Sequence, residues 1–252
     1  YWAGKNIGMF NIIKKILYPL TKEIRAVFTY PSNRIDLEQD DYDAYWEKKR
    51  GGAHLATLSS WQEARARYIA SEIIKTSPVS VVDIACGTGN ILKYLKDTIP
   101  GMRTIGVDVS PKALLVAKTL GIETKETSDI LKTLEYMDPV DYILFLEILE
   151  HLPNAEMILK AGVVKAKRAV FFSIPNTGYI TYRLRLLFGK VPAQWHRHPG
   201  EHVRFWTMQD VKWWLRALSI DTYTIHTYKG VPLLNKVWPA LFGAAFVVMI
   251  RV

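Results

Sequence analysis

Residues 81–90 read Val-Val-Asp-Ile-Ala-Cys-Gly-Thr-Gly-Asn, and this stretch decides how the 252-residue chain folds. An apolar run with an acid near its end is followed by two glycines and then by apolar residues at helical spacing. That order predicts a strand, a tight turn and a helix start, in which backbone can approach a nucleotide-like ligand without an intervening Cβ. Nineteen residues beyond Gly89, Asp108 ends a second apolar run. An acid about 20 residues after a glycine turn is positioned to accept both hydroxyls of a ribose.

These features resemble the class I S-adenosylmethionine-dependent methyltransferases, whose first motif reads acid-x-Gly-x-Gly-x-Gly and whose second strand ends in a ribose-binding acid. The chain departs from that motif at Ala85, where glycine is usual. The alternatives are a dinucleotide-binding unit and a strand–helix turn without a ligand. Dinucleotide folds favour G-x-G-x-x-G, but Leu92 occupies the position of the last glycine, and Asp83 is an acid that a dinucleotide site does not need. The sequence therefore favours a methyltransferase-type site.

The resemblance implies a role for each acid near the glycine turn. Asp83 would orient the turn and the amino group of the methionine moiety, Asp108 would bind the ribose, and Asp129 would accept a hydrogen bond from the adenine amino group. Asp129 is also suited to cap a helix, and the two roles are compatible. The expected cofactor-binding residues are Asp83, Ala85, Cys86, Gly87, Gly89, Asp108, Val109, Asp129, Ile130 and Glu147.

Strand and helix patterns alternate along the chain. The expected strands are Val79–Ile84, Thr104–Val109, Ile122–Lys125, Val140–Leu146, Ala169–Ile174, Ile220–Thr227 and Ala244–Arg251. Helices are expected to begin at a capping box near Ser59, near Asn90, Pro111, Asp129 and Asn154, and after Thr207. The pattern predicts an α/β, Rossmann-like fold with a mostly parallel seven-stranded sheet and helices on both faces. The resemblance implies that the last strand is antiparallel and inserts into the sheet.

Two parts flank or interrupt this domain, which we expect over residues 51–252. Residues 1–50 are an N-terminal helical extension whose end, near residues 45–52, is either a lid over the cofactor or an ordinary surface connection. Within it, residues 9–28 form a basic amphipathic pattern with Pro19 in its middle. Such a helix lies on a membrane surface, or it packs on the domain or on a partner. An insert at about 175–206 is expected to cover the acceptor side of the cleft.

Composition excludes several classes of protein. One cysteine, Cys86, rules out a disulfide framework and fits a cytoplasmic chain, and no secretory signal is evident. The longest uncharged apolar stretch, residues 238–250, has 13 residues, whereas a spanning helix needs about 20. A formal net charge of +9 arises from 33 basic and 24 acidic residues. No nucleic-acid-binding module accompanies it, so nucleic acid is not the expected partner, and peripheral contact with a membrane surface through residues 9–28 remains open.

Residues 145–152 resemble the fourth motif of small-molecule methyltransferases, with Glu147, Glu150 and His151 in a Glu-x-x-Glu-His set. A histidine here can act as a general base, because its pKa is near neutrality. Packing of His151 against the sheet is the alternative. In the ubiquinone-pathway O-methyltransferases this set is associated with a divalent cation, but many relatives without metal share the spacing. Our catalytic candidates are Glu150, His151 and His202, and no metal is expected.

The segment that begins at Ser173-Ile174-Pro175-Asn176 and ends at Thr207 resembles the MetW-like methyltransferases, and that likeness spans roughly residues 79–217. Aromatic and basic side chains alternate in it, as suits an acidic or sugar-like acceptor. The predicted acceptor-binding residues are Tyr179, Arg183, Trp195, His198 and His202. Its histidines lack a fixed cysteine or carboxylate partner in the sequence, which disfavours zinc. An exposed basic helix and loop is the alternative.

The expected function is transfer of a methyl group from S-adenosylmethionine to oxygen of a small acidic, sugar-like or phenolic acceptor, with S-adenosylhomocysteine as product. The sulfonium is already activated, so the protein mainly aligns the reactants and accepts a proton. Two other functions stay open. One is an RNA methyltransferase, and the other is a cofactor-binding partner subunit with little catalysis, since MetW-like proteins are linked to a homoserine acyltransferase. The oligomeric state is also open.

Overall fold

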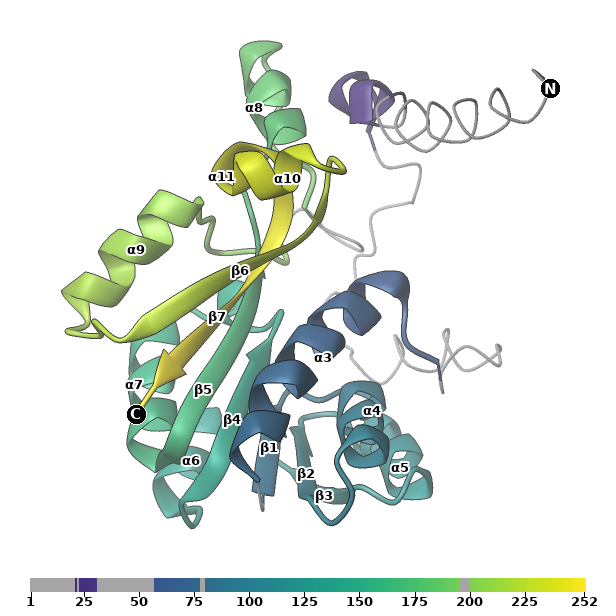
Figure 1. Cartoon of the computed structure of the whole chain (residues 1–252), viewed down its shortest axis with the longest axis vertical. Coiled ribbons are helices and arrows are strands. Elements are labelled where there is room, and N and C mark those ends of the chain that lie inside the picture. The colour runs from purple at the N-terminus through teal and green to yellow at the C-terminus, as the bar shows by residue number, and fades with distance from the viewer. Residues whose placement is uncertain (1–20, 22, 31–56, 78–79, 195–199) are drawn as a thin grey trace, which may run out of the picture.

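The computed structural model of the chain (Figure 1) describes residues 21, 23–30, 57–77, 80–194 and 200–252. Most of the predicted basic helix at 9–28 and the predicted lid near residues 45–52 lie outside the described residues. So do two predicted acceptor-binding residues, Trp195 and His198.

A single seven-stranded sheet forms the centre of the described chain, with the strand order β3-β2-β1-β4-β5-β7-β6. The strands are β1 Ser80–Ile84, β2 Arg103–Asp108, β3 Glu123–Glu126, β4 Val140–Leu146, β5 Ala166–Pro175, β6 Tyr223–Gly230 and β7 Gly243–Arg251. The first five are mutually parallel, and β7 runs antiparallel between β5 and β6. The predicted fold class, including the inserted antiparallel last strand, is confirmed.

The register of the central strands brings their carboxyl ends to one edge of the sheet. Ile84 at the end of β1 lies opposite Val107 of β2 and Phe145 of β4. The residues that follow these three strands therefore meet at the same edge, where ligands bind in open α/β sheets.

The six predicted helix starts are confirmed, and four of these helices begin with a side-chain cap. Ser59 and Gln62 form the capping box of α3 (Ser60–Ile73), and Thr207 and Asp210 form that of α9 (Met208–Ala217). The other helices along the sheet are α4 Asn90–Thr98, α5 Pro111–Thr119, α6 Ile130–Tyr136 and α7 Ala155–Lys165, and the shorter ones are η2 Ile74–Thr76, η3 Leu149–His151, α8 Ile180–Leu187, α10 Leu234–Val237 and α11 Pro239–Phe242.

Each face of the sheet has its own buried core, because successive residues of a strand point to opposite faces. Phe171 of β5 packs with Ile69 of α3 and Leu92 of α4. Its neighbour Phe172 packs on the other face with the α7 and α9 side chains Leu159 and Trp214. Helices thus cover both faces, as predicted.

The penultimate strand begins later than the sequence suggested. β6 starts at Tyr223 rather than at Ile220, because the intervening residues close helix α9. Ser219 adopts a left-handed φ of 61°, and the Ile220 N–H donates to the Leu215 carbonyl at 2.9 Å. A turn of this kind satisfies the last carbonyls of a helix.

The described end of the N-terminal segment packs on α8 (Figure 1). Residues 23–28 are helical, and the buried Arg185 of α8 donates from Nη1 to the Ala26 and Thr29 carbonyls, each at 2.6 Å. Lys190 donates to the Phe28 carbonyl at 2.7 Å. Cations at the carboxyl end of a helix satisfy its last carbonyls and oppose its dipole. In the described parts of the chain, no helix combines the length and apolar character needed to cross a membrane.

Candidate functional site

The turn after β1 is built from left-handed residues. Ala85, Gly87 and Gly89 have φ values of 62°, 56° and 74°. Glycine adopts this conformation without the cost of roughly 1–2 kcal/mol that a Cβ imposes, so Ala85 is strained at the position where the methyltransferase motif usually has glycine. At Gly89 space is limiting too, because an added Cβ would lie 3.0 Å from the Cβ of Ala117 on α5. The turn therefore needs glycine for its backbone and for the packing of α5.

Asp108 fixes this turn to the end of β2. Its Oδ2 accepts the Gly87 N–H at 2.7 Å, and its Oδ1 accepts the Ser110 N–H at 2.9 Å. A carboxylate has about four acceptor positions, so Asp108 keeps capacity for further donors such as ribose hydroxyls. The sequence indicated a ligand role for Asp108; its role in joining the two strand ends is visible only in the structure.

Asp83 is a buried acid below the turn, with 3% of its surface exposed. Burial raises the pKa of its carboxyl group to about 8 against the opposing Arg65 guanidinium, and the Asp108 charge contributes a smaller part of the rise. Its Oδ1 has no hydrogen-bond partner in the described part of the chain. An orphaned buried carboxyl oxygen is costly unless a ligand satisfies it, and a cationic ligand such as an ammonium group fits it best.

Asp129 caps α6, as its position after β3 suggested. Its Oδ1 accepts the Lys132 N–H at 3.0 Å, and the residue is exposed to solvent. Val109, which follows β2, is 47% exposed and is therefore open to a ligand at the same edge of the sheet. The N-cap role of Asp129 leaves its second oxygen accessible for an adenine amino group.

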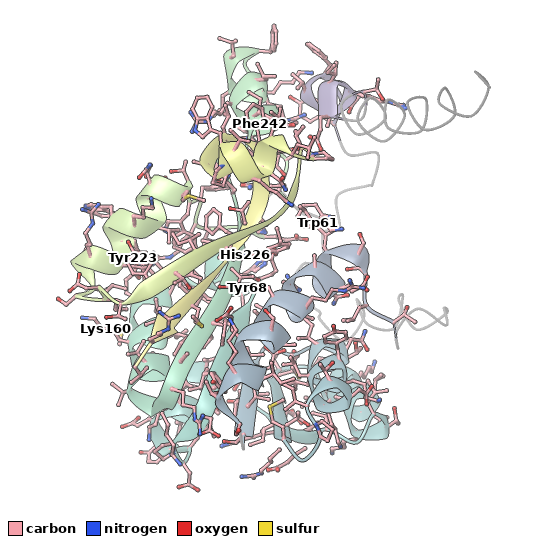
Figure 2. All side chains as sticks on the ribbon, in the orientation of Figure 1. Trp61, Tyr68, Lys160, Tyr223, His226 and Phe242 are labelled. Carbon is pink, nitrogen blue, oxygen red and sulfur yellow. The ribbon has the colours of Figure 1, made fainter. Side chains whose placement is uncertain are left out.

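Glu147 follows β4 with a left-handed φ of 56° and is the centre of a polar network. Its Oε1 accepts hydrogen bonds from Ser173 Oγ at 2.8 Å and Tyr228 Oη at 3.0 Å, and it lies 3.2 Å from Arg65 Nη1. These partners come from β5, β6 and α3. Helix α3 is held against β6 by Tyr68, whose ring stacks on His226 with centroids 4.0 Å apart (Figure 2). Sequence reasoning connected none of these three partners with Glu147, because all are distant from it in the chain; Ser173 was noted only as the start of the Ser-Ile-Pro-Asn stretch.

Glu150, His151 and His202 come together beside this network. One potential ligand atom from each lies within 4.8 Å of the others. Glu150 is 1% exposed, and neither carboxyl oxygen has a hydrogen-bond partner within the described residues. Burial, and next the Glu147 charge, raises its pKa well above the ordinary value. The structure thus assembles all three predicted catalytic candidates.

The orientation of His151 follows from one hydrogen bond. Its Nδ1 lies 2.7 Å from the carbonyl oxygen of Glu201. A carbonyl only accepts, so the proton is assigned to Nδ1, and Nε2 is the basic nitrogen. The His202 ring meets the His151 ring edge to face with centroids 4.7 Å apart.

The returning end of the insert is fastened to the loop after β4. The Val203 and Arg204 N–H groups both donate to the Glu150 carbonyl, at 3.0 and 3.2 Å. These bonds bring His202 to Glu150, which supplies the carboxylate partner that the sequence did not reveal for the histidines of the insert. A carboxylate with two imidazoles is a donor set that holds divalent transition metals, so the cluster has the residues for a cation.

A cavity of about 340 Å³ opens next to the cluster, and His202 forms part of its wall. The lining residues are Thr177, Leu186, Val191, Pro192, Gln194, His202 and Phe205. Its volume falls in the range of small-molecule sites, and its lining is mainly apolar. The predicted insert therefore contributes a pocket, and His202 is the one basic residue in the described part of its wall.

The remaining predicted acceptor residues lie away from that wall. Tyr179 precedes α8, is 3% exposed and packs edge to face on Tyr182. Arg183 is exposed to solvent and donates from Nε to the Gly178 carbonyl at 2.7 Å. Of the described acceptor candidates, His202 alone is part of the cavity lining.

Comparisons with known proteins agree with this geometry. A family model described as a methyltransferase domain matches residues 45–219. The ubiquinone biosynthesis O-methyltransferase of Idiomarina loihiensis is 29% identical over 174 residues, which are 62% of this chain and 69% of that protein. The protein of the same name from Nitrosomonas europaea is 32% identical over 126 residues, 47% of this chain and 53% of that protein. The chain thus spans between 53% and 69% of the length of these two relatives.

Solved structures give the same fold. A SAM-dependent methyltransferase from Archaeoglobus fulgidus superposes with a TM-score of 0.56 at 16% identity, and the match covers 84% of this chain and 100% of that one. At this level of identity, the match speaks for the fold alone.

Proposed function

Since the chain belongs to the methyltransferase-domain family and is an S-adenosylmethionine-dependent methyltransferase, we propose that it methylates an oxygen atom of a small phenolic acceptor. The observation that carries this proposal is the junction of the Glu150–His151–His202 cluster with the apolar cavity, which share His202. The two relatives described above are named O-methyltransferases of ubiquinone biosynthesis, which supports oxygen as the methylated atom.

The cofactor residues keep the roles that the motif implies. We assign Asp83 to the methionine ammonium group, because its buried Oδ1 has no partner within the described residues and a cation beside it would favour the ionised acid. Asp108 takes the ribose hydroxyls with the acceptor capacity that Gly87 and Ser110 leave it. Asp129 takes the adenine amino group while it caps α6.

His151 is the proton acceptor in this mechanism. The hydroxyl of the acceptor gives its proton to Nε2, and an oxygen lone pair forms the new bond to the methyl carbon. The carbon–sulfur bond breaks at the same time, and its electron pair returns to sulfur, so the cofactor leaves as S-adenosylhomocysteine. The Glu201 carbonyl holds Nδ1–H and thereby stabilises the imidazolium that forms.

A divalent cation fits the same cluster as the alternative to proton transfer, because Nε2 of His151 has one lone pair and cannot both bind a cation and accept a proton. Glu150 has two buried oxygens without partners, and His151 and His202 add nitrogen donors within 4.8 Å. Bound there, a cation would lower the pKa of the acceptor hydroxyl by acting as a Lewis acid. Titration of Mn²⁺ into the wild type and into Glu150→Gln and His202→Gln variants tests this site without reference to activity. Binding that is lost in both variants supports it.

The cavity favours a phenol over a sugar or an acid. Leu186, Val191, Pro192 and Phe205 offer apolar contact, and among the described residues the wall has no lysine or arginine to pair with an acidic group. An apolar substituent buried here contributes about 0.8 kcal/mol for each methylene group.

A series of catechols that differ in the length of one alkyl chain tests the proposal. We expect O-methylated products, with a kcat/KM that rises by about threefold to fourfold for each buried methylene group until the cavity is full. Matched sugars and aliphatic acids should react at least tenfold more slowly. Intact cofactor binding with no transfer to any phenol would overturn the proposal and favour a partner subunit. Transfer to RNA alone would favour the nucleic-acid alternative.

A further inference from the structure

Three segments that are distant in the sequence gather at one end of the molecule (Figure 1): residues 23–30, α8 with the turn after it, and α10 with α11. Each carries large apolar side chains that remain exposed. We call this surface the apolar end, and its members are Ile24, Phe28, Leu186, Leu187, Phe188, Val191, Leu233, Leu234, Val237 and Trp238. Contiguous exposed apolar surface of this kind marks an interaction site.

Specific contacts hold the three segments of the apolar end together. Arg185 ties residues 23–30 to α8, and the Phe28 and Phe188 rings pack with centroids 5.1 Å apart. Asn176, just before α8, donates from Nδ2 to the Ala240 and Gly243 carbonyls at 3.1 and 2.7 Å. Figure 2 shows Phe242 of α11 at the base of α8. The three segments are therefore held together without burying their outer apolar side chains.

The exposed charged side chains in the described residues of the three segments are all basic. The sequence contains no aspartate or glutamate between Glu156 and Glu201, and none after Asp221. In residues 23–30 the only acid, Glu23, accepts a hydrogen bond from the Thr181 hydroxyl. The cations of these segments include Arg25, Arg183 and Lys236, all exposed to solvent.

This combination fits the interface of a lipid bilayer. Apolar side chains of a peripheral protein enter the boundary between headgroups and acyl chains, and cations meet the phosphates of anionic lipids. Tryptophan is enriched at that depth, and Trp238 is 59% exposed. Exposed apolar residues elsewhere, such as Val164 on α7 and Trp213 on α9, lie on other elements.

We propose that the apolar end docks the protein on an anionic phospholipid bilayer. Leu187, Val237 and Trp238 enter the interface, while Arg25, Arg183 and Lys236 lie at the level of the phosphates. This surface differs from a lone amphipathic helix at residues 9–28, because α8 and the α10–α11 segment supply most of it.

The docked orientation has a consequence that rests on the proposed function. Leu186 and Val191 belong both to the apolar end and to the wall of the cavity, and both are more than half exposed. The cavity mouth therefore faces the bilayer, and an acceptor dissolved in the membrane enters without crossing water.

Co-sedimentation of the full chain with vesicles tests the docking. Vesicles of phosphatidylcholine with phosphatidylglycerol should bind the protein at low salt, and pure phosphatidylcholine vesicles should bind it more weakly. Charge attraction is screened at high salt, so part of the binding should be lost there. Lys236→Glu should lower the partition coefficient about 30-fold, since it removes one attractive charge and adds one repulsive charge near an anionic surface. Trp238→Glu adds one repulsive charge and removes the indole, so it should lower the partition coefficient at least about fivefold.

The matched controls reverse or add charge away from the apolar end. Trp213→Glu and Val164→Glu alter equally exposed apolar residues, and Lys118→Glu on α5 reverses an exposed lysine. These variants should bind vesicles within about twofold of the wild type. Equal loss in variants and controls, or no vesicle binding by the wild type, overturns the proposal. The proposal is also overturned if the protein forms a dimer that Trp238→Glu dissociates and no protein binds to the vesicles. Methyl transfer to a water-soluble catechol should be unchanged in Trp238→Glu, which separates a failure of docking from a failure of the proposed function.

Discussion

Replacement of Asp108 by asparagine tests how the cofactor site is held together. The carboxylate accepts two backbone N–H groups, from Gly87 at 2.7 Å and from Ser110 at 2.9 Å. Asparagine keeps the size of the side chain but has one oxygen. Its amide nitrogen must then face one of the two N–H donors, so one hydrogen bond is lost and one donor is left without an acceptor.

The magnitude follows from that geometry. A hydrogen bond to a charged group contributes about 1.5–3 kcal/mol, and an unsatisfied buried donor costs a further 1–3 kcal/mol or so. We expect a total loss of about 3 kcal/mol in the free energy of unfolding. For a chain of this size, each kcal/mol lowers Tm by about 2–4 °C, so Asp108→Asn should unfold about 6–12 °C below the wild type. Loss of a charged acceptor for the ribose should weaken S-adenosylmethionine binding about tenfold.

Thermal unfolding and calorimetric titration of the cofactor measure both effects. Asp129→Asn is the matched control, because Asp129 also accepts a backbone N–H but is an exposed N-cap, where asparagine serves as well as aspartate. Its Tm should stay within about 1 °C of the wild type. If Asp108→Asn has the Tm and the cofactor affinity of the wild type, this carboxylate neither holds the glycine turn nor binds the ribose.

Three further predictions concern the same edge of the sheet. Arg65→Met should lower the stability measured by chemical denaturation far more than Arg67→Met, because it removes the cation from the partly buried network of Glu147, whereas Arg67 forms an exposed pair with Glu63; equal losses would contradict the network. The raised pKa of Asp83 means that the folded chain holds a proton which the unfolded chain releases, so its contribution to stability is fully present below pH 3.8 and declines as pH rises toward about 8. An ammonium ligand favours the ionised acid, so cofactor affinity should rise from pH 6 to 8 in the wild type and not in Asp83→Asn. Parallel pH profiles in the two proteins would contradict the assignment of Asp83 to the ammonium group. Gly89→Ala should cost more stability than Gly101→Ala, because both have positive φ but only the Cβ at Gly89 meets a neighbour, Ala117; equal melting temperatures would show that the packing of α5 does not limit this position.

Local signals explain what could be predicted from the sequence. The cap of α3 at Ser59 depends on residues three apart, and the ligand role expected of Asp108 depends on its spacing of nineteen residues from Gly89. Both signals can be read from a single sequence because the residues concerned are near each other in the chain. The inserted position of β7 came from the resemblance to a family, since nothing in residues 243–251 specifies which strands they join.

Contacts between distant residues account for what could not be predicted. Glu147 meets Arg65 and Tyr228, which lie on α3 and β6 and carry no spacing signal. His202 reaches Glu150 only because the insert returns and bonds to the loop after β4. The apolar lining of the cavity was also hidden, because nothing in the sequence shows that Arg183 bonds to the Gly178 carbonyl and lies outside the described lining.

The most direct test of the central claim is the methylation of a soluble catechol by the wild type and by His151→Gln. Mass spectrometry with a labelled cofactor methyl group measures the ratio of O-methylated catechol to S-adenosylhomocysteine. Calorimetry measures the cofactor affinity of both proteins. We predict one product molecule for each S-adenosylhomocysteine in the wild type, and a rate lower by about 100-fold or more in His151→Gln with unchanged cofactor affinity. Cofactor bound with no methylated catechol, or equal rates in the two proteins, would contradict the account.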